Sequence, residues 1–309
     1  MIAAMLNEAW VAMGANRLRT FLTMLGMVIG VSAVILMLAI GQGAQQRVQA
    51  SIASMGSNLF IILSGSVTSG GVRMGGGATP TLTLADAQAL EELPLVVAVA
   101  PTSPGTAQIV YGSNNWSTQI SGTTPGFLIV RDWPLSSGAV FTESDIRSAT
   151  RVALLGQTVA RNLFGDEDPV GKTIRIKNSP YLVLGLLSAK GQSLDGRDQD
   201  DTVVVPVTTA QRKLFGSQFG GTVRFIMVQA ESDEAMPAVE RSMNELLRQR
   251  HRIREGADND FSVRNLTALA NTAAETAQVM SLMLGAIASV SLLVGGIGIM
   301  NIMLVSVTE

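Results

Sequence analysis

Two long apolar runs stand out in the pattern of hydrophobic and polar positions along the chain. Residues 20–40 and residues 279–307 contain no charged side chain and consist mainly of aliphatic residues. An α-helix rises about 1.5 Å per residue, so about 20 residues cover the hydrocarbon core of a bilayer, which is about 30 Å thick. Because lipid offers no partner to an unpaired backbone amide, we expect both runs to be membrane-spanning helices. The alternative, a buried core helix of a soluble protein, is disfavoured by the length of the uncharged runs.

The first run also has features of a cleaved signal peptide, with Arg17 and Arg19 before it and a small-residue pattern at its end. The apolar region of a signal peptide is about 7–15 residues long, so an uncleaved signal anchor is the better interpretation. Arginines stay on the cytoplasmic side of a membrane helix. This orientation places residues 41–278 outside the cytoplasm and Glu309 back inside it.

Helical periodicity extends beyond both apolar runs. In residues 1–19 apolar side chains recur at helical spacing and include Trp10, which predicts an amphipathic helix at the cytoplasmic membrane surface. Apolar stripes continue from the two runs into polar sequence on the exterior side, over residues 41–57 and 262–278. We interpret these two segments as a helical stalk. Its stripe residues are Val48, Ile52, Leu266, Leu269, Ala273 and Ala277.

Residues 58–261 show an α+β pattern and are expected to form a large exterior domain. Alternating apolar residues and turn signals predict strands over residues 58–63, 96–100, 106–111, 116–121, 152–155, 173–176, 181–187, 202–205 and 224–229. A capping box at Thr83 and Asp86 predicts the start of a helix that Pro94 ends. Further helices are expected near residues 158–164 and over about 233–254. Residues 64–77 are rich in glycine and serine, which is typical of a flexible connection.

Composition narrows the class of protein. Only 15% of the 309 residues are charged, against about 25% in soluble domains, and the charges are concentrated in the exterior segment. The net charge of −2 lacks the basic excess of a nucleic-acid-binding protein, so no nucleic-acid partner is expected. The chain has no cysteine, which excludes disulfides, a thiolate nucleophile and a thiolate metal site.

Three segments come close to ligand-binding or catalytic motifs. Gly165 and Gly171 precede Lys172 as in a phosphate loop, but five residues instead of four separate the glycines and strand sequence follows, so a turn is favoured. The acids of residues 195–201 lack the bidentate acid of a calcium loop, and a solvated acidic loop is expected. His251, the only histidine, lies among arginines at a helix end, where cations complement the helix dipole. We expect no enzyme activity, no catalytic residue, no metal and no cofactor.

Small residues in the two apolar runs predict close packing between helices. The small-x-x-x-small spacing lets two helix backbones approach each other, and an amide within lipid is expected to face a partner helix. The expected packing residues are Gly26, Gly30, Gly285, Ser289, Gly295, Gly296, Gly298 and Asn301. Glycine is also common in membrane helices without such a role, and this alternative stays open.

Segments along essentially the whole chain, in order, resemble the MacB-like permeases of type VII ABC transporters. The first segment is residues 16–30, at the start of the first apolar run. Similar segments follow at residues 54–60, 152–156, 163–165 and 169–172. The most specific one is residues 293–309, which begin Leu293-Val-Gly-Gly-Ile-Gly-Ile-Met-Asn301.

This resemblance implies a fold, partners and a mechanism. It implies a periplasmic domain with a porter-like part and a second lobe, carried on membrane helices that extend into a stalk. Two permease chains dimerise in the bacterial inner membrane, and a cytoplasmic ABC ATPase moves the stalk, which is mechanotransmission. MacB-like members expel antibiotics, peptides or siderophores with a periplasmic adaptor and an outer-membrane channel, whereas relatives extract lipoproteins or activate cell-wall hydrolases. The contacts to the ATPase carried over by resemblance are Trp10, Arg17 and Arg19.

The resemblance also implies that the sequence is part of a longer protein. The family continues past residues 308–309 into a basic cytoplasmic loop and two more membrane helices. The leading hypothesis is a non-catalytic permease subunit of an efflux transporter. Its rival is a two-span membrane sensor whose exterior domain binds a ligand, which requires a cytoplasmic output domain after the second helix. A secreted enzyme lacks both a catalytic motif and a reason for the second apolar run.

Overall fold

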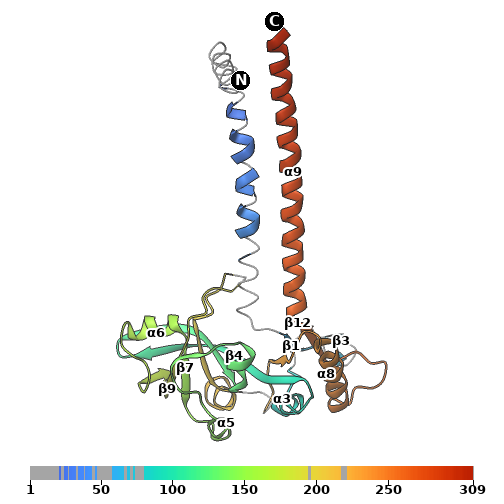
Figure 1. Ribbon diagram of the computed structural model, residues 1–309. Coiled ribbons are helices and arrows are strands. Elements are labelled where there is room, and N and C mark those ends of the chain that lie inside the picture. Colours follow the sequence, from blue (N-terminus) through green and yellow to red (C-terminus); the bar gives the residue numbers. More distant parts are fainter. Residues whose placement is uncertain are drawn as a thin grey trace. The chain divides into compact units, whose positions relative to one another are not determined.

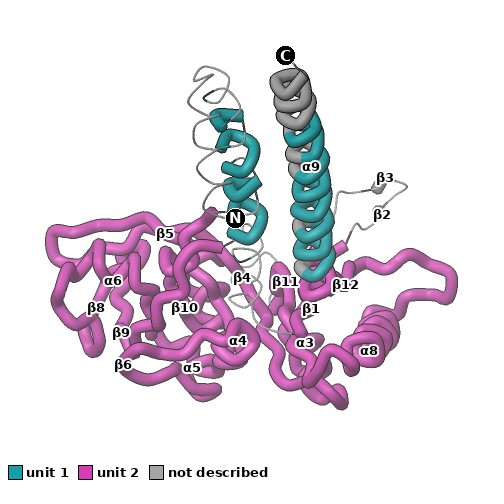
Figure 2. Tube along the Cα trace, turned by 45° about the horizontal axis from the view of Figure 1, so that its top comes forward, with its two compact units in different colours: residues 1–49, 271–309 teal, residues 50–270 magenta. Residues whose placement is uncertain are grey.

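The computed structural model describes residues 58–65, 68–69, 72–73, 80–193, 196–216 and 221–308 and, near the N-terminus, residues 21, 24–26, 28–32, 34–37, 39–43 and 46. The chain divides into two compact units (Figure 2). Residues 50–270 form one unit, which contains the exterior α+β domain. Residues 1–49 and 271–309 form the other, which contains the two apolar runs.

The first lobe of the exterior domain consists of two interleaved strand–helix–strand units. The elements are β1 (Leu59–Ser64), α3 (Leu84–Glu91) and β4 (Val96–Tyr111), then β11 (Phe225–Ala230), α8 (Met236–Arg250) and β12 (Phe261–Asn265). The strands lie in the order β12-β1-β11-β4, and every neighbouring pair is antiparallel. This is a ferredoxin-like arrangement. It explains why a strand–helix–strand succession recurs in the sequence.

Apolar side chains of the strands and of both helices form the core of the first lobe. Fully burying one such side chain stabilises a fold by about 1.5–3 kcal/mol. This packing therefore holds α3 and α8 on the sheet. The fully buried core residues include Phe60, Ile62, Leu90, Ile226, Val228, Met243 and Leu247.

The second lobe is inserted between β4 and β11. Its strands continue the sheet in the order β4-β5-β10-β7-β9-β6, and β8 pairs with β4 and β9. Figure 1 labels β4, β7 and β9 of this lobe. A second core lies here, with Ile109, Ile120, Leu155 and Tyr181 fully buried. The elements are β5 (Asn114–Thr123), α4 (Gly126–Val130), β6 (Leu135–Gly138), α5 (Glu143–Ser148), β7 (Val152–Leu155), α6 (Gln157–Phe164), β8 (Thr173–Ile176), β9 (Ser179–Leu187), β10 (Thr202–Pro206), α7 (Val207–Thr209) and a π-helix (Ala210–Phe215).

Strand β4 links the two lobes because it changes its pairing partner along its length. Up to Thr102 it pairs with β11, and from Ser103 onward with β5. The sequence pattern predicted two separate strands, at 96–100 and 106–111, because Pro101 and Pro104 interrupt it. The structure has one 16-residue strand instead, since both prolines lie where the partner changes.

A close approach of backbone explains one glycine of the second lobe. A Cβ atom on Gly122 of β5 would lie 2.2 Å from the Cβ of Ala210, at the start of the π-helix. Any side chain at this position would push the π-helix off the sheet.

Most of the predicted strands and helices are confirmed, some with shifted ends. The capping box is present, with the Thr83 N–H donating to the Asp86 carboxylate at 2.9 Å and the Asp86 N–H to the Thr83 hydroxyl at 3.2 Å. The strands expected over residues 106–111 and 116–121 form a hairpin within β4 and β5, and its turn is only Gly112 and Ser113, because Tyr111 pairs with Asn114. The flexible connection expected at residues 64–77 includes two short paired strands, β2 (Thr68–Ser69) and β3 (Val72–Arg73).

Other elements were not predicted, and one boundary differs. The elements α4, β6, α5 and the π-helix are four to six residues long and show no clear apolar periodicity. Residues 262–265 were assigned to the second stalk helix, but they belong to β12, which pairs with β1. The helix begins only at Leu266, because backbone pairing along β1 holds the preceding residues extended.

Candidate functional site: the stalk helix and a histidine cluster

Helix α9 (Leu266–Thr308) begins directly after β12 and is fixed to the sheet by its first turn. The side-chain oxygen of Asn265 accepts the N–H of Ala268 at 2.8 Å, which caps the helix. The hydroxyl of Thr267 accepts the N–H of Leu59 in β1 at 3.0 Å. Leu266 packs against the core of the first lobe. A displacement of this first turn therefore acts on β1 and β12 directly.

Helix α9 is continuous over 43 residues, which corresponds to about 65 Å of helix. Continuity from residues 266–278 into the second apolar run is a finding of the structure. It follows from the absence of proline in the segment and from the position of its first glycine, Gly285, far from the exterior end. Leu269 and Ala273 are exposed on the helix. One helix thus connects the exterior domain to the second apolar run.

Among the described residues, Met24–Gly43 is the one helix with the length and composition of a membrane span. The second apolar run lies within α9, and its large apolar side chains are exposed wherever they are described, for example Val279, Leu282 and Leu293. The candidate residues Trp10, Arg17, Arg19, Val48 and Ile52 lie outside the described residues.

The two long helices of this unit approach each other at Gly41 and Ser281. A Cβ atom on Gly41 would lie 2.7 Å from the Ser281 Oγ and 3.2 Å from its Cβ. A larger residue at position 41 would therefore collide with α9. The sequence pattern did not single out this pair, because Gly41 has no small residue four positions away on the same helix face.

The packing role expected of the small residues stays a prediction. At Gly26, Gly285 and Gly296 an added Cβ atom would have no neighbouring atom within 4 Å among the described residues. Their surfaces are free to meet another helix. Ser289 donates its hydroxyl to the Gly285 carbonyl at 2.8 Å, within its own helix. Gly30 is half-buried, and Gly295, Gly298 and Asn301 lie on α9.

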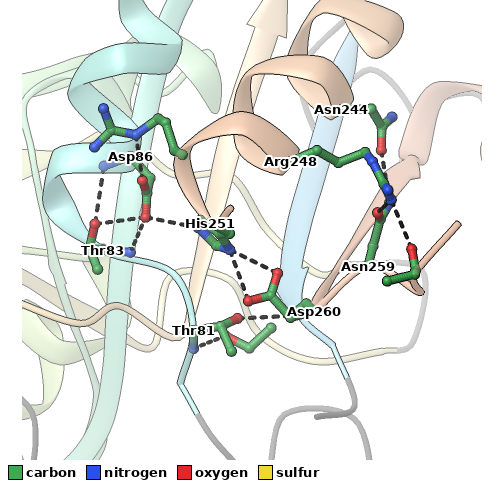
Figure 3. A network of polar contacts seen from close by, with 11 residues as sticks. Thr81, Thr83, Asp86, Asn244, Arg248, His251, Asn259 and Asp260 are labelled. Carbon is green, nitrogen blue, oxygen red and sulfur yellow. Dashed lines mark hydrogen bonds and ion pairs between the residues drawn. The ribbon is translucent and has the colours of Figure 1, made fainter. Parts of the chain in front are cut away.

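A buried polar cluster joins three elements of the first lobe (Figure 3). Asp86 in α3 and Asp260, next to β12, face the ring of His251, which follows α8. One ring nitrogen of His251, Nδ1, lies 2.8 and 3.0 Å from the two Asp260 oxygens, and the other, Nε2, lies 3.3 Å from Asp86 Oδ2. Arg250 donates its Nε–H to Asp86 Oδ1 at 2.7 Å. The cluster therefore combines two carboxylates with two basic side chains.

The cluster is also tied to neighbouring backbone. The hydroxyl of Thr81 donates to the Asp260 carbonyl at 2.8 Å, and the N–H of Gly65, which follows β1, donates to the same carbonyl at 2.7 Å. The Phe261 ring stands edge-on to the His251 ring at 5.8 Å between centroids. The segment that enters β12 is thus held by α8 and by the end of β1.

The interactions within the cluster favour the ionised carboxylate of Asp86 and the protonated imidazole of His251. Burial alone would raise the pKa of the Asp86 carboxyl, but hydrogen bonds from His251, Arg250 and Thr83 together hold that pKa well below its usual range. The hydrogen bond to Asp86 raises the pKa of the His251 imidazole, against the opposing effect of burial, and Asp260 adds to the rise. Both effects arise because each ion stabilises the charge of the other.

The arginines near His251 make contacts within the domain. Arg248 donates to the carbonyls of Ala257 at 3.1 Å and Arg254 at 2.9 Å, and also to the side chain of Asn259. These bonds close the loop after α8. From the sequence we predicted only that the cations at this helix end, His251 included, interact favourably with the helix dipole. The contacts of His251 with Asp86 and Asp260 were not predicted, because the fold brings these distant residues together.

The two other segments that resemble ligand-binding motifs, at residues 165–172 and 195–201, make structural contacts within the domain. Lys172 forms an ion pair with Glu167 at 2.6 Å on the surface and is followed directly by β8, as expected for a turn into a strand. The acidic loop is less solvated than expected. Asp200 is buried and accepts the N–H groups of Lys190 and Gly191, and Asp201 accepts the indole N–H of Trp116 at 2.8 Å.

In the described part of the chain, no group of three or more His, Asp or Glu side chains could hold a metal ion. In the His251 cluster both ring nitrogens already face carboxylates. The arrangement can hold or release a proton, but it presents no activated nucleophile.

Comparison with known proteins identifies similar sequences along the whole chain. Residues 20–246 match the model of the MacB-like periplasmic core domain family. A macrolide export ATP-binding/permease protein MacB of Syntrophobacter fumaroxidans is 40% identical over 98% of the chain and 50% of its own length. A protein of the same name from Rhodospirillum rubrum is 43% identical over 98% of the chain and 45% of its own length. The chain thus spans about half the length of the curated relatives it matches.

Two solved structures share the fold. The periplasmic region of MacB from Actinobacillus actinomycetemcomitans superposes with a TM-score of 0.57 at 23% identity, over 74% of this chain and 95% of that one. The extracellular domain of the noncanonic ABC-type transporter YknZ from Gram-positive bacteria gives a TM-score of 0.52 at 21% identity, over 67% of this chain and all of that one. The α+β fold expected of residues 58–261 is confirmed by this likeness.

Proposed function

Because the chain belongs to the family of the MacB-like periplasmic core domain, we propose that it is the permease part of a MacB-type ABC exporter. The observation that carries the proposal is the similarity, over 98% of the chain, to relatives named macrolide export ATP-binding/permease proteins. In this proposal the exterior domain lies in the periplasm and the two apolar runs cross the bacterial inner membrane. The exported compounds are macrolides or similar antibiotics and peptides.

In this proposal the chain catalyses no reaction and transmits a conformational change from the cytoplasmic side to the exterior domain. ATP hydrolysis on the cytoplasmic side displaces the membrane helices, and α9 carries the displacement to the exterior domain. Two observations support this role. Helix α9 is uninterrupted from Leu266 to Thr308, and its first turn is bonded to β1 through Thr267. Between Leu266 and Gly285 the helix contains no proline and no glycine, the residue types that most often break a helix.

Exposed apolar surface supports the membrane and the partners of this proposal. Side chains such as Val279, Leu282 and Leu293 on α9, and Phe21 and Ile35 on the first helix, are more than half exposed. Water-exposed apolar surface of this extent is unfavourable, so lipid and a second permease chain cover it. The ATP-binding part, contacted through Trp10, Arg17 and Arg19, completes the transporter. A periplasmic adaptor and an outer-membrane channel receive the cargo.

The direct test is macrolide accumulation in cells that lack their own macrolide exporter. Cells with the complete transporter built on this chain should accumulate several-fold less labelled erythromycin than cells whose ATP-binding part carries an inactivating change in its phosphate loop. If ATP hydrolysis depends on the chain but erythromycin accumulation is unchanged, macrolides are the wrong cargo. If neither depends on it, the permease function is wrong.

A further inference from the structure

The protonation state of His251 is constrained by what its two ring nitrogens face. Nδ1 lies 2.8 Å from a carboxylate oxygen of Asp260, and Nε2 lies 3.3 Å from a carboxylate oxygen of Asp86. Ionised carboxylates only accept hydrogen bonds, and a neutral imidazole has only one N–H to donate. Both contacts can be hydrogen bonds only when the ring carries a proton on each nitrogen.

The His251 and Asp86 side chains at the centre of the cluster are shielded from water, so their charges act strongly on each other. The side chains of His251 and Asp86 are only 8% and 5% exposed, whereas those of Asp260 and Arg250 are 29% and 35% exposed. Among the described residues, the charged groups facing the imidazole are Asp86 from α3 and Asp260 from the segment entering β12. Arg250 of α8 binds the second oxygen of Asp86. With a doubly protonated ring, two positive charges balance two negative ones.

We propose that Asp86, His251 and Asp260 form a proton-dependent latch, which fastens the end of α8 to α3 and to the segment entering β12. Loss of one ring proton leaves one ring nitrogen facing a carboxylate without a hydrogen between them. It also leaves two carboxylates with a single guanidinium. The imidazole then loses its hydrogen bond to one of the two carboxylates, while Arg250 still binds Asp86, and the first lobe loosens next to the strand that continues into α9. This property goes beyond the proposed transport function and does not rest on it.

The pH range of the latch follows from the direction of each shift. The pKa of His251 is raised in the folded chain, so its stabilising effect is complete below the ordinary imidazole value of about 6.5 and is lost as the pH rises through the raised pKa. The pKa of Asp86 is lowered, so its effect is complete above the ordinary carboxyl value of about 4 and is lost as the pH falls through the lowered pKa. The latch is therefore fully closed between about pH 4 and 6.5 and opens as the pH rises through the raised pKa of His251.

The first measurement is a titration of the full chain in lipid nanodiscs by nuclear magnetic resonance. Because His251 is the only histidine, a histidine label gives a single imidazole signal. The latch requires a midpoint above the ordinary imidazole pKa of about 6.5. A midpoint at or below that value overturns the proposal, and this readout needs no variant.

The second measurement is amide hydrogen exchange, corrected for the intrinsic effect of pH, at pH 6 and pH 9. Exchange in α8 should be faster at pH 9, while α6 in the second lobe should be unchanged. The pH effect on α8 should disappear in His251→Gln, which cannot change its charge. It should persist in Arg252→Gln, which removes a charge from the exposed neighbouring residue. An equal pH effect in wild type and His251→Gln overturns the latch.

Discussion

Replacing Ala273 by proline should abolish export while leaving the exterior domain folded and ATP hydrolysis active. Ala273 lies in the uninterrupted part of α9 between the sheet and the apolar run. Proline removes a helical hydrogen bond and clashes with the preceding turn, at a local cost of about 3 kcal/mol. The exterior domain should stay folded, because its two cores lie elsewhere. Export and ATP hydrolysis are measured in the same reconstituted vesicles.

The matched control for this change is Ala273→Leu, which keeps the helical hydrogen bonds and has a high helix propensity. It enlarges the side chain at an exposed position. If Ala273→Leu also stops export, packing of the stalk against another helix at this position matters. If Ala273→Pro exports at the wild-type rate, α9 does not act as a rod.

Replacing Asp86 by alanine should lower the free energy of unfolding of the exterior domain by about 3 kcal/mol at pH 7. The change removes a carboxylate that is only 5% exposed and leaves His251 and Arg250 with less negative charge to balance them. It also removes one half of the capping box that begins α3. Chemical unfolding of the full chain in detergent, followed by tryptophan fluorescence, measures the loss.

Asp145 provides a control of the same local geometry without the buried ions. It forms a capping box with Thr142 at the start of α5, where it accepts the Thr142 N–H at 2.8 Å in an exposed setting. Asp145→Ala should therefore lower the free energy of unfolding by only about 0.5–1 kcal/mol. Equal losses for the two variants would mean that Asp86 acts only as a helix cap.

Local signals in the sequence were sufficient for the features that depend on neighbouring residues. The capping box of α3 needs only Thr83 and Asp86, three positions apart, and both of its hydrogen bonds are present. The continuity of α9 depends on residue types along one helix. A continuous apolar run predicted β7, which is buried at all four positions, and alternating apolar residues predicted β8, which is buried on one face.

Features that depend on residues far apart in the sequence could not be predicted from local patterns. The His251 cluster joins positions 165 residues apart, and no local pattern distinguishes Asp86 from an ordinary capping acid. The same holds for the approach of Gly41 to Ser281 and for the burial of Asp200. Strand β12 was missed although Phe261 and Val263 alternate with polar residues, because it is only five residues long and directly precedes the helix.

The most direct test of the transmission of motion by α9 is the distance between two copies of Leu269 in the assembled transporter. The chain has no cysteine, so Leu269→Cys places one spin label on each exposed stalk position. Double electron–electron resonance should show a shifted distance distribution when ATP is trapped in the ATP-binding part. The shift should be lost when Ala273→Pro interrupts the helix between the label and the membrane. An unchanged distribution in a transporter that hydrolyses ATP and exports its cargo would contradict the account.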